Sequence, residues 1–277
     1  MLSVAIVSWL LVASPAARAP YVDEAFASAS LGRTMAYRVL LPPDYNSASN
    51  TSYRVLYLLH GLGGGYLDWS TRTDLATFAR ALPLIVVMPE GDNSWYTNAA
   101  QDGPRFEDYI ADDLILDVER KYRVIRTNGG RAIAGLSMGG YGALKIALKH
   151  SGSYAAAGSF SGAFPITDPG YADLFPSERD HIERIFGPPG DPTRAANDIF
   201  SIAERAPTAA APPLYFDTGT TDRIALAGSR RLAEILQRRG YRYEFHEVPG
   251  GHSWEYWNRS LRRFLPWLMD VFAQPAQ

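Results

Sequence analysis

A serine stands between two glycines in the pentapeptide Gly135-Leu136-Ser137-Met138-Gly139. This G-x-S-x-G pattern is typical of a sharp turn from a strand to a helix, which exposes a serine hydroxyl above the end of a parallel sheet. Glycine on both sides lets the backbone turn tightly and lets the strand and helix approach each other. Because 24 glycines in 277 residues give roughly 0.15 such matches per random chain, the motif needs support from its surroundings.

A candidate base comes later in the chain, in the glycine-rich loop Pro249-Gly250-Gly251-His252-Ser253. This loop joins the last predicted strand to the last predicted helix, where an imidazole can take a proton from Ser137. The alternative is that His252 only caps the helix. The other four histidines are expected to be structural or solvated, with His60 shaping the loop that it begins: His60, His150, His181 and His246.

Two aspartates compete for the place of the acid that would orient the imidazole. Asp217 and Asp222 flank Thr218-Gly219-Thr220-Thr221, directly after a predicted strand. The acid must accept a hydrogen bond from the imidazole N–H, which fixes the tautomer and stabilises the imidazolium. Asp222 is favoured because it lies out in the loop, from where it can reach His252. Asp217 is expected to end the strand as a structural carboxylate.

A second glycine-rich loop, His60-Gly61-Leu62-Gly63-Gly64-Gly65, follows an apolar run that predicts a strand. Acyl-transfer enzymes need two backbone N–H groups that point at the developing oxyanion, and this loop nominates the N–H groups of Leu62 and Met138. The alternatives are a flexible turn and a dinucleotide-binding loop. The second is disfavoured because Tyr66 stands where a third glycine would be needed. No metal-binding or Walker motif occurs, so neither a metal nor a cofactor is expected.

The elements that must position these residues follow an alternating pattern from Val22 onward. Strand-like and helix-like segments alternate, which predicts an α/β fold: a mostly parallel central sheet flanked by helices, in one domain over residues 20–277. Residues 165–213 are rich in proline, glycine and charge, and are expected to form a small cap or insertion. Strands are expected at 37–41, 54–59, 84–88, 131–136, 155–160, 213–217 and 241–248, and helices at 106–122, 177–186, 195–206, 224–239 and from 254 onward.

Composition excludes several classes of function. The chain has 27 basic and 29 acidic side chains, a net charge of −2, so neither nucleic acid nor an anionic membrane is an expected partner. It contains no cysteine, which excludes disulfides, thiolate metal sites and a cysteine nucleophile. The oligomeric state leaves no readable trace in the sequence.

The first residues have the pattern of a signal peptide. Leu2 to Val12 are almost wholly apolar, and Ala17-Arg18-Ala19 matches the small-x-small pattern of a cleavage site, although no Lys or Arg precedes the apolar run. The apolar run is too short to span a bilayer, so no stable membrane anchor is expected. Residues 1–19 therefore predict export to the periplasm or the outside, or a cytoplasmic location if this segment is not a functional signal.

Several motifs in order carry a family resemblance: the loop at 60–64, Met88 to Tyr96, Gly135 to Gly140, Gly219 to Asp222 and Gly250 to Trp254. Together they resemble the esterase D-type branch of the α/β-hydrolases. This branch includes S-formylglutathione hydrolases, feruloyl esterases, short-chain (tributyrin-type) esterases and mycolyltransferases. The resemblance implies a Ser137, Asp222 and His252 triad, with Leu62 and Met138 as the oxyanion hole.

Departures from the branch narrow the expected activity. The loop after His60 lacks the Thr-Cys usual in S-formylglutathione hydrolases, and Asp222 stands where mycolyltransferases use glutamate. The remaining resemblance is to exported feruloyl and short-chain carboxylesterases. The expected function is therefore a serine carboxylesterase that cleaves small-molecule esters through an acyl-enzyme. The alternatives are an acyltransferase, an S-formylglutathione-type thioesterase or a non-catalytic binding protein on the same fold.

Four aromatic residues fall near the predicted strand ends, where they could line an acyl or aryl pocket. The same large side chains serve equally well as core. These candidates are Trp69, Trp95, Tyr96 and Trp254.

Overall fold

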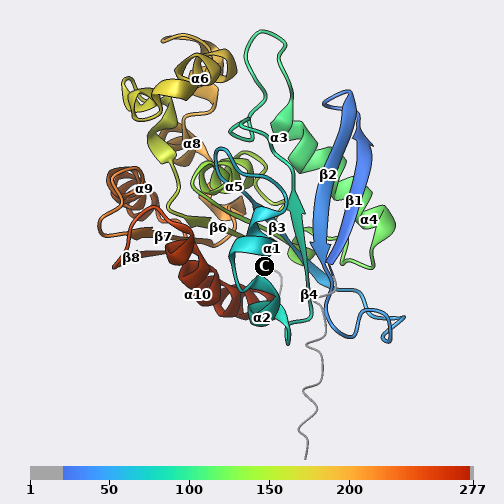
Figure 1. Cartoon of the computed structure of the whole chain (residues 1–277). Coiled ribbons are helices and arrows are strands. Elements are labelled where there is room, and N and C mark those ends of the chain that lie inside the picture. Colours follow the sequence, from blue (N-terminus) through green and yellow to red (C-terminus); the bar gives the residue numbers. More distant parts are fainter. Residues whose placement is uncertain (1–20, 275–277) are drawn as a thin grey trace, which may run out of the picture.

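The computed structural model of the chain describes residues 21–274, so the predicted signal peptide lies outside the described residues. Within them, eight strands form one sheet in the order β1-β2-β4-β3-β5-β6-β7-β8 (Figure 1). β2 runs antiparallel to both neighbours, and the other pairs are parallel. The predicted mostly parallel sheet is confirmed. The strands are β1 (Tyr21–Ser28), β2 (Arg33–Leu40), β3 (Arg54–Leu59), β4 (Leu84–Pro89), β5 (Arg131–Leu136), β6 (Ala156–Phe160), β7 (Leu214–Gly219) and β8 (Tyr243–Val248).

The sequence pattern missed one strand and shortened another. β4 follows directly from its continuous apolar run, which is buried on both faces. β1, at the edge of the sheet, carries small and acidic residues with alternating exposure and pairs with β2 along all eight residues. Its polar face gives no apolar signal, and the strand expected at 37–41 extends back to Arg33 for the same reason.

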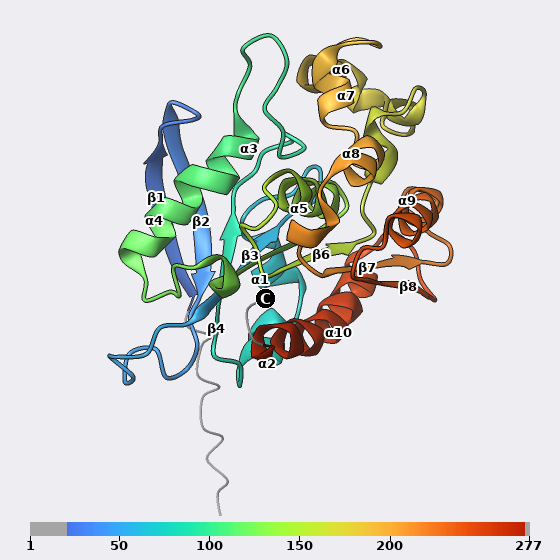
Figure 2. The ribbon, with the colours of Figure 1, turned by 180° about the vertical axis from the view of Figure 1, so that it is seen from behind.

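Helices cover both faces of the sheet and enclose two cores (Figures 1 and 2). Successive side chains of a strand point to opposite faces of the sheet. Tyr57 therefore belongs to the core on one face, and Leu58 to the core on the other. None of the helices within residues 21–274 is both long and apolar enough to cross a bilayer. One face is covered by α3 (Phe106–Asp108), α4 (Leu114–Lys121), α5 (Met138–Lys149), α8 (Ile199–Arg205) and α9 (Leu226–Arg239), and the other by α1 (Asp68–Arg72), α2 (Leu75–Ala79) and α10 (Trp254–Ala273).

The helix predicted at 106–122 is present but not uniform. α3 and α4 are joined without a break by a π-helical segment, Tyr109–Asp113. The basic residues at its end and the acidic residues at its start agree with the helix dipole.

The segment 165–213 forms short helical turns together with α6 (Arg179–Phe186), α7 (Pro192–Ala196) and α8. The single helix predicted at 195–206 is wrong: α7 and α8 are separate, because the Asp198 side chain accepts from the N–H groups of Phe200 and Ser201 and starts a new helix. α6 projects at one end of the molecule, whereas α8 lies beside α5 (Figures 1 and 2). The segment joins the main core through α8 and through the buried Ile182 and Phe186 of α6.

Candidate active site

The nucleophile candidate, Ser137, lies in the turn between β5 and α5. Its backbone has φ 51° and ψ −115°, a conformation that a residue with a side chain adopts only when its surroundings impose it. The flanking glycines allow this turn: a Cβ on Gly135 would lie 2.5 Å from the Gly139 backbone, and a Cβ on Gly139 would lie 2.5 Å from the His60 carbonyl oxygen. The glycine spacing is therefore required by contact distances.

The three residues predicted as a triad come together from three separate loops. Ser137 Oγ lies 2.9 Å from His252 Nε2, and His252 Nδ1 lies 2.9 Å from Asp222 Oδ2. The carboxylate can only accept, so Nδ1 carries a hydrogen and the Ser137 hydroxyl donates to Nε2. Loops after β5, β7 and β8 meet because these parallel strands end at the same edge of the sheet. This geometry can transfer a proton from the serine to the imidazole.

Asp222 is held in one orientation by its own loop. Its Oδ1 accepts from the N–H groups of Ile224 and Ala225 at 3.0 and 3.1 Å, which leaves Oδ2 directed at His252. The side chain is fully buried. Burial favours the neutral acid, but the hydrogen bond and charge of His252 outweigh it and hold the pKa of Asp222 below its usual value of 3.8. Asp222 is therefore a carboxylate at neutral pH.

Asp217, the competing aspartate, lies within β7, and its side chain points to the face of the sheet that α10 covers. Its Oδ1 accepts from Tyr256 and Ser260 of α10, and its Oδ2 lies 3.2 Å from the Arg263 guanidinium. It makes no hydrogen bond to His252. Asp217 thus ties α10 to the sheet.

None of the other four histidines, all within residues 21–274, makes a hydrogen bond to Ser137. His150 lies 3.2 Å from Glu107, His181 contacts the Asn93 carbonyl, and His246 is exposed beside Glu244. His60 differs from these three histidines because it is buried, with only 1% of its surface exposed.

The two N–H groups expected to hold the oxyanion are free. Within residues 21–274, neither the N–H of Leu62 nor that of Met138 donates to another protein group. Gly61 packs directly on the nucleophile turn: a Cβ there would lie 2.5 Å from Leu136 Cδ1 and 3.5 Å from Ser137 Cβ. The Met138 N–H belongs to the residue after Ser137, and the Leu62 N–H belongs to a residue that lines the Ser137 pocket; these are the two places from which acyl-transfer enzymes of this fold supply oxyanion donors.

The pocket over Ser137 has a volume of about 240 Å³. Of the four aromatic candidates only Trp254 lines it. Trp69, Trp95 and Tyr96 are at most 1% exposed, so they lie in the core and offer no surface to a ligand. Trp69 donates to the Leu59 carbonyl and packs against Trp254, so it acts on the pocket only from behind.

Sequence patterns missed several residues of the pocket wall. Trp257 follows Trp254 by three residues on α10, so helical spacing beside His252 was a usable signal. Phe175 lies in an irregular segment, where no periodicity exists to place it. Ile224, the first residue of the helix expected at 224–239, lies in the turn before α9, which begins at Leu226. Asp68 and Arg72, an ion pair on α1, also border the pocket.

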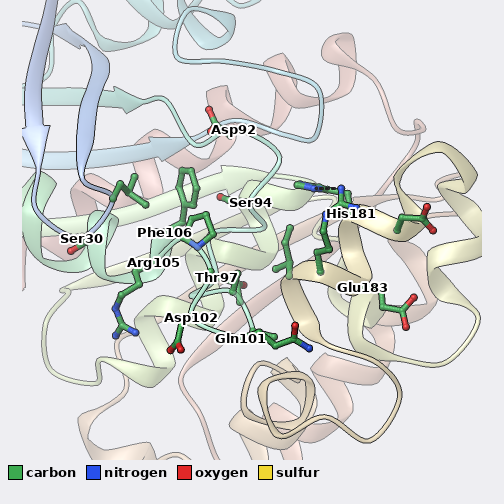
Figure 3. Close-up of a pocket in the computed structure, with 18 of the residues that line it drawn as sticks. Ser30, Asp92, Ser94, Thr97, Gln101, Asp102, Arg105, Phe106, His181 and Glu183 are labelled. Carbon is green, nitrogen blue, oxygen red and sulfur yellow. Dashed lines mark hydrogen bonds between the residues drawn. The ribbon is translucent and has the colours of Figure 1, made fainter.

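A larger hollow of about 1370 Å³ lies elsewhere, between the turn that joins β1 to β2, the loop after β4 and α6. Figure 3 shows Thr97 and Phe106 on one side of it and His181 and Glu183 on the other. Ser137 and His252 do not line it. The part of the chain that the structure describes holds no group of three or more His, Asp or Glu side chains placed to bind a metal ion.

A mostly parallel sheet with a serine at the sharp turn after a central strand defines the α/β-hydrolase class of fold. A family model described as "Putative esterase" matches residues 28–268, so the chain belongs to this esterase family of serine hydrolases. The predicted resemblance is confirmed.

Named relatives agree with this membership. Esterase Rv1288 of Mycobacterium tuberculosis is 36% identical over 82% of this chain and 54% of that protein, so the chain spans about half the length of that relative. The acetyl esterase of Caldicellulosiruptor saccharolyticus is 25% identical over 89% of this chain and 97% of that protein.

Solved structures show the same fold. FphF, a fluorophosphonate-binding serine hydrolase of Staphylococcus aureus, superposes with a TM-score of 0.79 at 26% identity, over 92% of this chain and 99% of that one. Structures of a ferulic acid esterase and an S-formylglutathione hydrolase, each 26% identical to this chain, also match.

Proposed function

We propose that the chain is a serine carboxylesterase whose nucleophile is Ser137, whose base is His252 and whose acid is Asp222. The observation that carries this proposal is the unbroken hydrogen-bond chain from Ser137 Oγ through His252 to Asp222, with both distances 2.9 Å. Membership of the esterase family supports the reaction class.

The reaction follows from the geometry in two steps. Ser137 Oγ attacks the ester carbonyl carbon while His252 Nε2 takes its proton; the alcohol then leaves with that proton, and an acyl-enzyme remains. Water attacks the acyl carbon in the same way, again giving its proton to His252, and releases the acid and free Ser137. The N–H groups of Leu62 and Met138 hold the oxyanion in both steps, each contributing a factor of about 10² to 10³.

The size of the pocket favours an ester with a short acyl chain as the substrate. Its volume of about 240 Å³ is below the range of about 300 to 1,000 Å³ usual for drug-sized ligands. Phe175, Trp254 and Trp257 supply apolar walls, which suit an alkyl group. The acetyl esterase relative supports this choice, and a feruloyl group is the alternative to be tested.

The test compares kcat/KM for p-nitrophenyl esters from acetyl to decanoyl and for methyl ferulate, with Ser137→Ala as the blank. A steep fall with acyl length supports the short-chain proposal, whereas preference for methyl ferulate replaces it with an aryl pocket. Absence of turnover that depends on Ser137, together with absence of fluorophosphonate labelling, contradicts the esterase proposal. Products analysed with a competing alcohol distinguish hydrolysis from acyl transfer.

We also propose that the protein is exported, on the apolar run from Leu2 to Val12 and the cleavage pattern at Ala17-Arg18-Ala19. Expression of the full chain followed by mass spectrometry of the extracytoplasmic fraction tests this. A mature chain that begins at Pro20 supports export, and an intact chain confined to the cytoplasm contradicts it.

A further inference from the structure

His60 is a buried titratable side chain that the proposed reaction does not use. It follows β3 and directly precedes Gly61 and Leu62, and it is 1% exposed. Its Nδ1 lies 2.8 Å from the Gly61 carbonyl oxygen. Because a carbonyl oxygen can only accept, Nδ1 carries a hydrogen and donates it to Gly61.

This hydrogen bond fixes the direction of the next N–H. The peptide between Gly61 and Leu62 is trans and planar, so its C=O and N–H point to opposite sides. The Gly61 carbonyl is held on one side by His60 Nδ1 and by the N–H of Gly64 at 3.1 Å. The Leu62 N–H must then project from the other side, in the loop that lines the Ser137 pocket.

His60 is itself held on its far side by the loop after β4. The N–H of Gly91 donates to Nε2 at 2.9 Å, and Glu90 Oε1 lies 3.3 Å from the same nitrogen. Glu90 also accepts from the N–H of Asp92 and of Tyr66. Because Nε2 can accept from Gly91 only without a hydrogen of its own, this contact also places the ring hydrogen on Nδ1, where it donates to Gly61.

A second contact fixes the backbone of His60. The Tyr96 hydroxyl donates to the His60 carbonyl at 3.0 Å, and Tyr96 is fully buried. A Cβ on Gly91 or on Gly142 would lie 2.4 or 2.7 Å from the Tyr96 ring, so the backbone of both glycines packs directly against the ring. Tyr96 thus clamps the start of the oxyanion loop.

The clamp is anchored on the helix that begins at the other oxyanion donor. Lys145 Nζ donates to the Tyr96 carbonyl at 2.8 Å and pairs with Glu107 at 2.9 Å. Lys145 lies on α5, seven residues or about two turns after Met138. One helix therefore carries the Met138 N–H at its start and, further along, the contact that steadies the loop of the Leu62 N–H.

We propose that His60 is a positioning residue: its Nδ1–H, by holding the Gly61 carbonyl, directs the Leu62 N–H at the oxyanion. The inference rests on the proposed function, because an oxyanion forms only if Ser137 attacks a carbonyl. It assigns to His60 no contact with the substrate and no proton transfer.

Two substitutions distinguish the contribution of His60 Nδ1 from that of Nε2. In His60→Asn the amide nitrogen stands near the place of Nδ1 and can still donate to Gly61. In His60→Gln the longer side chain reaches toward the place of Nε2, and the donor to Gly61 is lost. We expect kcat to fall about 10- to 100-fold in His60→Gln with KM unchanged, and much less in His60→Asn, because a misaimed donor loses part of its contribution of about 10² to 10³.

Inhibition by an arylboronic acid supplies a readout that a purely structural role would not change. Its tetrahedral adduct on Ser137 uses the oxyanion hole, so its Ki should rise in parallel with the loss of kcat, while the melting temperature and the number of sites labelled by a fluorophosphonate stay the same. His246→Gln, at an exposed histidine, is the matched control and should leave all these values unchanged.

Wild-type kcat in folded His60→Gln overturns the inference, as does an equal loss in the Asn and Gln variants. If His60→Gln does not fold, His60→Ala, which also removes the donor to Gly61, replaces it: a kcat below that of His60→Asn at unchanged KM supports the inference, and a kcat equal to that of His60→Asn overturns it. Wild-type protein that neither labels at Ser137 nor hydrolyses esters refutes the proposed function instead, so the two failures are distinguishable.

Discussion

Asp217 and Asp222 lie five residues apart at the end of β7, and both are at most 1% exposed. Asp222 faces His252, and its pKa is lowered. Asp217 faces α10; burial raises its pKa above 3.8, although Ser260, Arg263 and Tyr256 oppose that rise. Burial alone therefore does not define the role of a carboxylate, which depends on the group that it meets.

The difference follows from their places on the chain. Asp217 is within β7, and its side chain points, like that of Tyr215 two residues earlier, to the face covered by α10. Asp222 lies beyond the strand, where the turn directs its carboxylate back to the sheet edge. Only the turn residue can reach the loop after β8.

The largest expected effect is that of Asp222→Asn. The amide can present a donor to Nδ1 and favour the wrong imidazole tautomer, so kcat should fall by about 10³- to 10⁴-fold. The melting temperature should fall only slightly, because the Asn oxygen can still accept from Ile224 and Ala225 and only the charge contact with His252 is lost. Ester hydrolysis and thermal melting measure the two quantities. A kcat near that of the wild type would remove Asp222 from the triad.

Asp217→Asn should show the opposite profile. It replaces a carboxylate that Arg263 contacts, so the free energy of unfolding should fall by about 1 to 3 kcal/mol while kcat stays the same. Urea unfolding and ester hydrolysis check this. If Asp217→Asn loses activity and Asp222→Asn does not, the assignment of the acid moves to Asp217.

A double-mutant cycle tests the difference between Asp217 and Asp222 through a smaller effect, the coupling of each aspartate to Arg263 in unfolding free energy. Asp217→Asn combined with Arg263→Met should be non-additive in unfolding free energy by about 0.5 to 3 kcal/mol, because the two side chains are in contact. Asp222→Asn combined with Arg263→Met should be additive, since these two residues share no hydrogen-bond partner among those described. Additivity in the first pair would show that the ion pair adds nothing.

The smallest expected effect is on the pH dependence of the unfolding free energy, to which the two carboxylates contribute with opposite signs. The lowered pKa of Asp222 gives stability that is present above 3.8 and is lost as the pH falls through its folded pKa. The raised pKa of Asp217 has the opposite sign: its contribution declines as the pH rises from 3.8 through its folded pKa. A tenfold difference in the acid dissociation constant between the folded and unfolded chain is equivalent to about 1.4 kcal/mol of stability.

Urea unfolding of the wild type and both Asn variants on either side of pH 3.8 measures this dependence. As the pH rises, the deficit of Asp222→Asn relative to the wild type should grow, and that of Asp217→Asn should shrink. Parallel curves for the two variants would contradict the opposite directions of the two pKa changes.

Prediction from sequence worked best where a local pattern carries the constraint. The apolar run of β4 and the glycine spacing around Ser137 follow from burial and from contact distances that any such turn must satisfy. It failed at β1, whose edge position removes the apolar signal, and at 195–206, where the single cap at Asp198 divides a helical pattern. Tertiary pairing and one side-chain hydrogen bond decided those two regions.

The aromatic residues show the same limit inside the site. Trp95 and Tyr96 lie next to each other in the chain near a strand end, yet both are fully buried, whereas Trp254 lines the pocket. Residue type and approximate position in the chain cannot distinguish an aromatic residue that lines the pocket from one that is buried in the core, because a large aromatic ring is suited to both.

By itself the sequence determined the order and type of the elements, the serine turn and the candidates for base, acid and oxyanion donors, since these depend on short-range spacing. Only the tertiary structure decided that Asp222 rather than Asp217 meets His252, and that His60 holds the Gly61 carbonyl. These contacts join residues through the direction of a side chain or of a peptide plane, and that direction is set by strands and helices distant in the chain.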